Sequence, residues 1–221
     1  MRKFLLSAVI ALAVALPGTS GTFNYVNWNS TSSTLPGPAT TVTGTLPGGI
    51  NVTYSGETEF VQINGVGPNW YGGFTSVYTN AVVSNMPPDS DIIAIDGTNA
   101  VHTVTFSAPV TGLIMDLVSL GQPSVYTSYT FSQPFSVLSM GPAVWGGPGT
   151  LTDIGSNTLQ GIEGDGVIQF AGSLSTLSWT GANGENWNGF TFGTPTSVPE
   201  PATWALMLAG LDLAGLRRVR R

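Results

Sequence analysis

The placement of the basic residues constrains the fold of this chain more than any other feature of its sequence. All six lie at the two ends: Arg2, Lys3, Arg217, Arg218, Arg220 and Arg221. Residues 22–198 hold ten acidic residues, the chain's twelve less Glu200 and Asp212, and His102 is the segment's only potential cation. Because no Lys or Arg can pair with these acids, the fold must depend on burial of apolar groups and on backbone hydrogen bonds.

The same pattern excludes several classes of function. Without Lys or Arg the segment cannot neutralise phosphates, so we expect no nucleic-acid binding. It also lacks the guanidinium group that grips carboxylates and phosphates with paired hydrogen bonds, which disfavours anionic ligands. The chain has no cysteine, which excludes disulfides, thiolate catalysis and Cys-ligated metals. A small metal cation or a neutral polymer is the better expected partner.

The N-terminal residues have the pattern of a secretory signal peptide. Arg2 and Lys3 precede a mostly apolar stretch at residues 4–15, which is shorter than the roughly 20 residues that span a bilayer. The small residues Ala13 and Ala15 fit cleavage after Ala15, and cleavage near Ser20 is the alternative. We therefore predict that residues 1–20 are a signal peptide, handled by the secretion translocon and signal peptidase. A retained membrane anchor is the other interpretation.

The C-terminal residues 198–221 form a second distinct segment. They begin with the motif Val198-Pro199-Glu200-Pro201. A mostly apolar stretch follows at residues 202–216 and includes Trp204, Leu206, Met207 and Leu208. The chain closes on Arg217, Arg218, Arg220 and Arg221. An interfacial Trp at one end of an apolar helix and arginines at the cytoplasmic end are typical of a transmembrane segment.

This tail is therefore expected to hold an exported chain transiently in the inner membrane. Asp212 interrupts the apolar stretch, and a charge there costs roughly 2.5–3.5 kcal/mol on insertion. Its position near the basic end lets it reach the interface or pair with Arg217 or Arg218, so it weakens the anchor without abolishing it. A terminal helix packed on the body is the alternative interpretation.

The tail resembles the PEP-CTERM sorting signal, which occurs in Gram-negative bacteria that make extracellular polysaccharide. The resemblance rests on Pro199-Glu200-Pro201, the apolar stretch and the arginines, which occur in that order at the end of the chain. It implies that an exosortase, a membrane enzyme, recognises the tripeptide, processes the tail and releases or transfers the body. It also implies that the body ends at the cell surface or outside the cell, in contact with polysaccharide.

Between the two ends, residues 21–197 read as one all-β domain. Short runs rich in Val, Ile, Thr, Tyr and Phe alternate with Gly, Pro, Asn and Ser, and no window keeps a helical period. Val104 and Phe106 share one face of a run while Thr103 and Thr105 share the other, as in a sheet with one buried face. We predict an antiparallel β-sandwich of jelly-roll type. The predicted strands are 51–55, 58–63, 91–95, 101–107, 112–118, 125–132, 135–138, 166–171, 174–180 and 189–192.

Two further observations concern this body segment. Residues 22–48 are rich in Ser, Thr, Gly and Pro, so we expect a leading strand and a flexible lead-in there. Residues 131–135, 145–147, 161–170 and 185–193 resemble the uncharacterised body domains that often precede PEP-CTERM tails. That resemblance supports a β-sandwich and implies no activity.

Aromatic residues are the candidate ligand contacts. Trp70 and Tyr71 precede Gly72-Gly73, and Trp145 precedes Gly146-Gly147, surroundings that favour exposed loops. Together with Trp187 these side chains could stack on sugar rings, since they combine an apolar face with a polar edge. Trp179 ends an alternating run and is expected in the core. Threonines spaced two apart at residues 41–45 and 103–105 suggest an ice-binding face, but they look too few and too scattered.

The polar residues offer weaker candidates. His102 is expected to be a satisfied histidine at a strand end, because no nucleophile motif accompanies it. Asp89, Asp91 and Asp96 are the best calcium-binding set, since calcium takes carboxylate ligands, but solvated turn acids are the favoured explanation. No other cofactor is indicated.

The leading hypothesis is a non-catalytic surface or matrix protein of an extracellular polysaccharide layer or biofilm. A carbohydrate-binding module that uses the loop aromatics is the first alternative, with ice binding a weaker form of it. A secreted hydrolase is the second alternative, because glycoside hydrolysis needs two carboxylates. The candidate acids for it are Glu163, Asp165 and Glu185.

Overall fold

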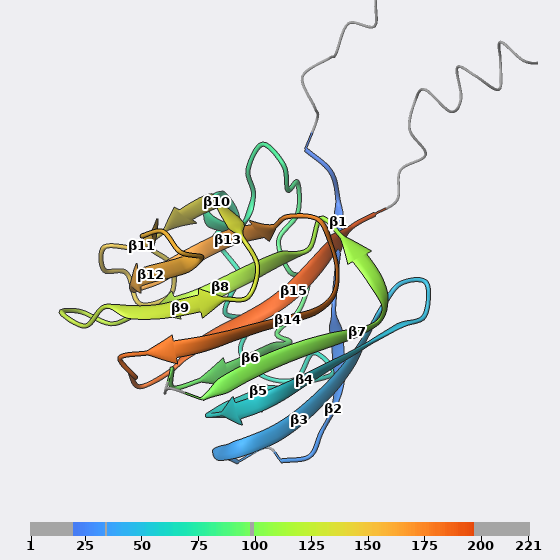
Figure 1. Ribbon diagram of the computed structural model, residues 1–221. Helices are drawn as coiled ribbons and strands as arrows, with labels where there is room; N and C mark the ends of the chain where they lie inside the picture. Colours follow the sequence, from blue (N-terminus) through green and yellow to red (C-terminus); the bar gives the residue numbers. More distant parts are fainter. Residues whose placement is uncertain (1–19, 34, 98–99, 197–221) are drawn as a thin grey trace, which may run out of the picture.

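The computed structural model describes residues 20–33, 35–97 and 100–196 (Figure 1). The predicted signal peptide, apart from Ser20, lies outside these ranges, as do the predicted sorting motif, hydrophobic tail and basic end. Within the described ranges, no helix has the length and apolar character needed to cross a membrane. All strands fall between Phe23 and Pro195, inside the segment predicted as the body.

Two antiparallel sheets make up the described part of the chain, and α1 (Thr75–Tyr78) is its single short helix. The first sheet has seven strands: β10 (Phe135–Gly141), β13 (Gly164–Phe170), β8 (Ile114–Leu120), β15 (Asn188–Pro195), β6 (Ile92–Ile95) and β5 (Phe60–Gln62) in order, with β1 (Phe23–Tyr25) also paired to β15. The second has eight, in the order β11 (Thr150–Asp153), β12 (Thr158–Ile162), β9 (Thr127–Phe131), β14 (Ser173–Ala182), β7 (Val101–Thr111), β4 (Ile50–Thr58), β3 (Gly37–Leu46) and β2 (Asn27–Thr31). The predicted all-β class is confirmed. From β6 onward most consecutive strands lie in opposite sheets, and jelly-roll connectivity stays a prediction.

The alternation of apolar and polar residues produces the two-layered packing. In β7 the side chains of Val104 and Phe106 are buried, whereas Thr103 and Thr105 lie on the outer face. The inner faces of the two sheets meet in one apolar core that draws on nearly every strand. The Trp28 indole on β2 donates a hydrogen bond to the Thr191 hydroxyl on β15 at 3.2 Å and so links the two sheets directly.

Aromatic rings dominate the centre of this core. Trp179 is 2% exposed and lies beside Tyr54 and Tyr129 of its own sheet and Phe190 and Phe192 of the opposite one. The expectation that Trp179 is a core residue is therefore confirmed.

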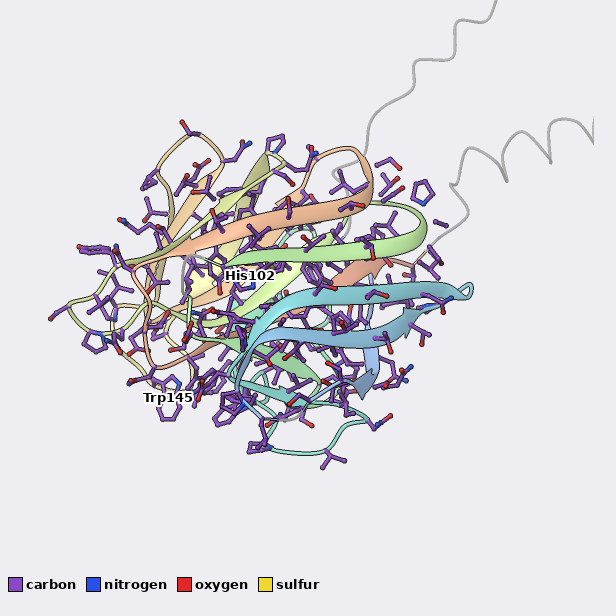
Figure 2. The ribbon with its side chains drawn as sticks, turned by 60° about the horizontal axis from the view of Figure 1, so that its bottom comes forward. His102 and Trp145 are labelled. Atoms are coloured by element: carbon purple, nitrogen blue, oxygen red, sulfur yellow. The ribbon has the colours of Figure 1, made fainter. Side chains whose placement is uncertain are left out.

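His102 also belongs to the core. Its ring stacks on Trp179 at 5.2 Å, and its Nδ1 lies 2.8 Å from the Tyr54 hydroxyl. Burial lowers the pKa of His102 to about 4, so the ring is neutral near pH 7. This agrees with the structural role expected for it, and Figure 2 shows the labelled ring among the strands.

A second apolar cluster covers the outer face of the seven-stranded sheet. Residues 63–91, which include α1, fold over β8 and β13 and bury Tyr71, Val77, Tyr78 and Val83 against them. This segment carries no strand, so the sheet is shielded on both faces, which explains why every residue of β8 is buried. Asp116 lies within β8 and is fully buried in this layer.

The expectation for residues 22–48 is wrong in part, because this segment forms β1, β2 and β3. The strands were missed because glycine and proline usually indicate turns. Gly44, for example, is a buried position within β3. A Cβ at Gly44 would lie 2.9 Å from the Trp28 ring, so glycine leaves the room that the indole needs. β11 and β12 were also missed, since both are short and largely polar.

The two ends of the body lie side by side. Phe23 on β1 pairs with Pro195 at the end of β15, and the Thr196 N–H donates to the Thr22 carbonyl at 2.9 Å. Residues 20 and 196 therefore leave the sandwich at the same pole, which we call the tail pole. The opposite end of β15, at Asn188, lies about 25 Å away for a strand of this length.

Replacing Trp179 with Ala should destabilise the body strongly, because it leaves a large cavity among five aromatic neighbours. We expect a loss of about 3–5 kcal/mol in the free energy of unfolding, measured by denaturant titration. Trp145, which is 54% exposed, serves as the matched control, and its replacement by Ala should cost less than about 1 kcal/mol. Equal losses for the two variants would contradict the assigned core.

Candidate functional site

Three tryptophans that are far apart in the sequence form one cluster at the pole opposite the chain ends. The ring centroids of Trp70 and Trp187 are 5.2 Å apart, and Trp145 lies 6.0 Å from Trp70 and 6.2 Å from Trp187. Phe60 supports the cluster from below, at 5.0 Å from Trp187. Trp145 is exposed and the other two are half-buried. Figure 2 shows Trp145 at the edge of the body, away from where the described chain ends.

Tyr71, in contrast, is not a surface residue, and its prediction as a ligand contact is wrong. It is fully buried and packs edge-to-face on Tyr78 at 5.2 Å. The Asn69 side chain accepts hydrogen bonds from the N–H groups of Tyr71 and Gly72, which fixes a tight turn. Neighbouring residues in this turn point in opposite directions, so Trp70 reaches the cluster while Tyr71 enters the core. The pKa of Tyr71 is raised well above its ordinary value by burial.

A pocket of about 390 Å³ opens beside the cluster. Trp145 and Trp187 supply its aromatic wall, and Glu163 and Glu185 supply its acidic groups. The remaining lining residues are Ser119, Gln122, Pro123 and Asn186. We call this site the tryptophan pocket. It brings together two of the predicted aromatic contacts and two of the three acids considered for hydrolysis.

Glu163 is positioned by unusual backbone geometry. Its φ is 45°, in the left-handed region, and Ser119 opposite it has a φ of 56°. Both are L-residues with a Cβ, for which this region is uncommon and strained. The Ser119 hydroxyl donates to the Glu163 carboxylate at 2.7 Å, and the Glu163 N–H donates to the Gly121 carbonyl at 3.1 Å. Strain held by such contacts is typical of binding and catalytic sites.

Glu185, in the turn before β15, is hydrogen-bonded to the same loop after β8. Its carboxylate accepts the Gly121 N–H at 2.6 Å and the Asn188 amide at 2.9 Å. Gly121 has a φ of 80°, and a Cβ there would lie 2.2 Å from the Gly161 carbonyl oxygen, so no other residue fits this position. Burial raises the pKa of Glu185 to about 7, with the charge of Glu163 a smaller contribution in the same direction.

Asp165 lies behind the pocket and does not line it. It is 1% exposed, and its carboxyl oxygens accept the N–H groups of Ser119 at 3.0 Å and Ala143 at 3.1 Å. The Tyr78 hydroxyl donates to it at 3.3 Å. Burial raises the pKa of Asp165 to about 7. Asp165 therefore holds β8 to the loop that carries Trp145, and its role is structural.

The predicted calcium set does not come together. Asp91 and Asp96 lie at opposite ends of β6, and Asp96 borders a different hollow with Glu57 and Glu59. Asp91 is buried, and its two oxygens accept the N–H groups of Trp28 at 2.9 Å and Gly65 at 2.7 Å. The described ranges hold no group of three or more His, Cys, Asp or Glu residues that could bind a metal ion. Asp89, Asp91 and Asp96 are thus not a shared site, and Asp91 is not a solvated turn acid.

The threonines, by contrast, are gathered rather than scattered. Strand register places hydroxyl residues in rows across the outer face of the eight-stranded sheet, with adjacent strands about 4.8 Å apart. One row is Ser30, Thr43, Thr53, Thr105 and Thr176, and the next is Thr41, Ser55, Thr103 and Ser178. The premise that set ice binding aside was therefore wrong, and ice binding itself stays a prediction.

Sequence inspection missed Ser119, Gln122 and Asn186 as pocket residues. They are ordinary polar residues, and only the register that joins β8, β13 and β15 brings their loops together. A repeated pattern was nonetheless visible: each of the clustered tryptophans lies within two residues of a glycine or in a run of polar turn residues.

We expect the body to be more stable at pH 5 than at pH 8. Burial raises the folded-state pKa of Asp91 to about 6, of Asp165 and Glu185 to about 7, and of Asp116 well above its ordinary value. Between about pH 4 and 7 the unfolded chain releases protons that the folded chain keeps, so stability falls as pH rises. His102 acts in the opposite direction below about pH 6.5, but four acids outweigh one histidine.

The test is denaturant unfolding at several pH values with Asp116→Asn. Neither Asp116 carboxyl oxygen has a hydrogen bond of good geometry, although the Tyr25 hydroxyl is close enough to interact with it. Its neutral amide isostere should remove about 1.4 kcal/mol per pH unit from the slope. The exposed Asp153→Asn is the control and should leave the slope unchanged. A flat profile in the unsubstituted protein would contradict the assigned burial of these acids.

The comparisons with known proteins concern the tail. The family model of the PEP-CTERM protein-sorting motif matches residues 197–221. No curated protein and no solved structure matches the chain. The matched residues include Val198-Pro199-Glu200-Pro201 and the basic end, and so confirm the resemblance stated from the sequence. The chain therefore carries a PEP-CTERM sorting motif behind a β-rich body, which indicates a protein that an exosortase sorts to the cell surface or the extracellular space.

Proposed function

We propose that this protein is a non-catalytic component of the extracellular surface, and that its tryptophan pocket binds polysaccharide. The observation that carries the proposal is the convergence of Trp70, Trp145 and Trp187 beside a pocket of about 390 Å³. Trp70 and Trp187 also pack against the second apolar cluster, whereas Trp145 joins them from a third loop and is 54% exposed to solvent. Aromatic faces with polar groups around them are a common solution for stacking on sugar rings.

The polar lining supports the same conclusion. Ser119, Gln122 and Asn186 offer hydroxyl and amide groups, which donate and accept hydrogen bonds as sugar hydroxyls require. The volume falls within the range of small-molecule sites, so the pocket would hold a short segment of a chain and leave the remainder in solvent. The body has no Lys or Arg with which to hold an anionic glycan.

The position of the pocket supports a role at a surface. The tail leaves the body at the tail pole, whereas Glu185, Asn186 and Trp187 lie directly before β15, at its other end. The pocket therefore lies at the end of the body opposite the point where the tail begins, which supports access to it while the tail is held in the inner membrane. After processing, whether the body is released or transferred to an anchor, this end remains available to the surrounding polysaccharide.

A secreted glycosidase is a second candidate, favoured by one specific observation. Glu163 and Glu185 line the same pocket, and the pKa of Glu185 is raised to about 7 by burial. An acid with a raised pKa near a second carboxylate is the arrangement that glycoside hydrolysis uses. Binding without catalysis is preferred because both carboxylates are held by neighbouring protein groups, Glu163 by Ser119 and Glu185 by Gly121 and Asn188.

Polysaccharide binding should quench or shift the tryptophan fluorescence of the protein. Replacing both Trp145 and Trp187 with Ala should abolish binding across a panel of neutral and amine-bearing glycans, because the stacking surface is removed. Val101→Ala, an exposed apolar truncation on the other sheet, is the control and should bind normally. No spectral change with any glycan would contradict the proposal. Shortened oligosaccharides after incubation would favour the hydrolase instead.

Processing at the sorting motif should remove the basic end. In a host with an exosortase, the intact mass of the mature extracellular protein should lack Arg217, Arg218, Arg220 and Arg221. Changing Pro199-Glu200-Pro201 to three alanines should leave the tail on the chain and keep it in the membrane fraction. Mass spectrometry of the two fractions measures this, and a mature extracellular protein that still ends at Arg221 would contradict exosortase processing.

A further inference from the structure

We propose that the tryptophan pocket selects glycans that carry a protonated amine, with Glu163 and Glu185 as the groups that bind the ammonium. This inference rests on the proposed polysaccharide-binding function and names the class of glycan. A partly deacetylated polymer of amino sugars has the required chemistry, because each free amine is positively charged near neutral pH while the rest of the ring is uncharged.

Charge balance is the first argument. Glu163 and Glu185 lie in one partly enclosed pocket, and the described part of the chain contains no Lys or Arg that could neutralise them. Two nearby carboxylates disfavour each other's ionisation, and a cation between them removes that penalty. The body has no Lys or Arg to supply this cation. A proton on Glu185, whose pKa is raised to about 7, relieves the penalty at lower pH, and a ligand cation relieves it at and above neutral pH. A neutral sugar would instead require both carboxylates to lose solvent without gaining a counter-charge.

The supply of hydrogen-bond acceptors is the second argument. An ammonium group has three N–H donors and needs oxygen acceptors around it. Ser119 donates to one oxygen of Glu163, so the contacts described for Glu163 occupy only part of its acceptor capacity. Glu185 is more fully used, because Gly121, Asn188 and the Thr127 side chain all interact with its carboxylate. Hydrogen bonds from an ammonium to a carboxylate are about twice as strong as those between neutral groups.

The aromatic wall is the third argument, and it separates an amine-bearing glycan from a metal ion. Trp145 and Trp187 line the same pocket as the glutamates. A tryptophan face attracts an organic cation and also stacks on the apolar face of a sugar ring, whereas it offers nothing to a calcium ion. The described residues provide no group of three metal-binding side chains here or elsewhere. An ammonium group on a sugar ring can contact the glutamates while the ring stacks on the tryptophans.

The test compares three oligosaccharides of equal length by titration calorimetry at about pH 7, where Glu185 is about half ionised before binding and an amine of the α-amino type is mostly protonated. Glucosamine hexamer should bind the purified full-length protein about tenfold more tightly than N-acetylglucosamine hexamer or cellohexaose, a difference of about 1.4 kcal/mol. Glu163→Gln and Glu185→Gln should each bring the three affinities together, while the exposed Asp153→Asn should retain the preference. Circular dichroism establishes that each variant is folded.

The outcomes distinguish this inference from the function on which it rests. Equal binding of the three hexamers by the unsubstituted protein would overturn the amine preference and leave polysaccharide binding intact. No binding of any hexamer would overturn both. A lysine hexamer that binds as tightly as the glucosamine hexamer would show attraction by net charge alone and would also overturn the inference. Because these comparisons use the unsubstituted protein, they decide the matter even if a variant fails to fold.

Discussion

Burying carboxylates without a cation is the constraint on which this structure depends. Asp91, Asp165 and Glu185 each accept hydrogen bonds from neutral protein groups in place of a Lys or Arg: two backbone N–H groups for each aspartate, and one backbone N–H and the Asn188 amide for Glu185. Each acid that bridges two such groups joins segments distant in sequence: Asp91 joins Trp28 to Gly65, and Asp165 joins Ser119 to Ala143. The acids therefore act as tertiary cross-links whose donors are the backbone itself, and burial keeps their affinity for protons high.

The tryptophan pocket is built from these same cross-links. Asp165 fixes β8 against the loop that carries Trp145, and Glu185 fixes the turn before β15 to Gly121. The pairing of Leu120 with Gly164 and of Val118 with Gly189 brings these loops together, and the carboxylates fix the turns beyond the paired residues. The buried carboxylate of Asp165 thus lies directly behind the carboxylates of Glu163 and Glu185, which line the pocket.

Some of this could be predicted from the sequence and some could not. Alternation in β7, together with the missing helical period, was enough to predict an all-β body with a buried Trp179. The sorting tail was recognisable because its three parts occur in a fixed order. The prediction for Tyr71 was wrong because the turn fixed by Asn69 directs its side chain into the core. The prediction for Asp96 was wrong because β6 separates it from Asp91. Neither the turn nor the length of β6 follows from composition. Gly44 looked like a break in β3 until the Trp28 ring was placed against it. The rows of threonine and serine on the outer sheet required the register of five strands.

The pairing of β1 with the end of β15 has a mechanical consequence. The tail continues directly from β15, which lies inside its sheet between β8 and β6 and also pairs with β1. A polymer held at the far pole and an anchor at the tail pole would pull β15 along its own length. Hydrogen bonds in an antiparallel ladder run perpendicular to the strand, so such a load shears many of them together instead of opening them one at a time. A load applied along β15 would therefore meet the resistance of its pairings with β8, β6 and β1 together.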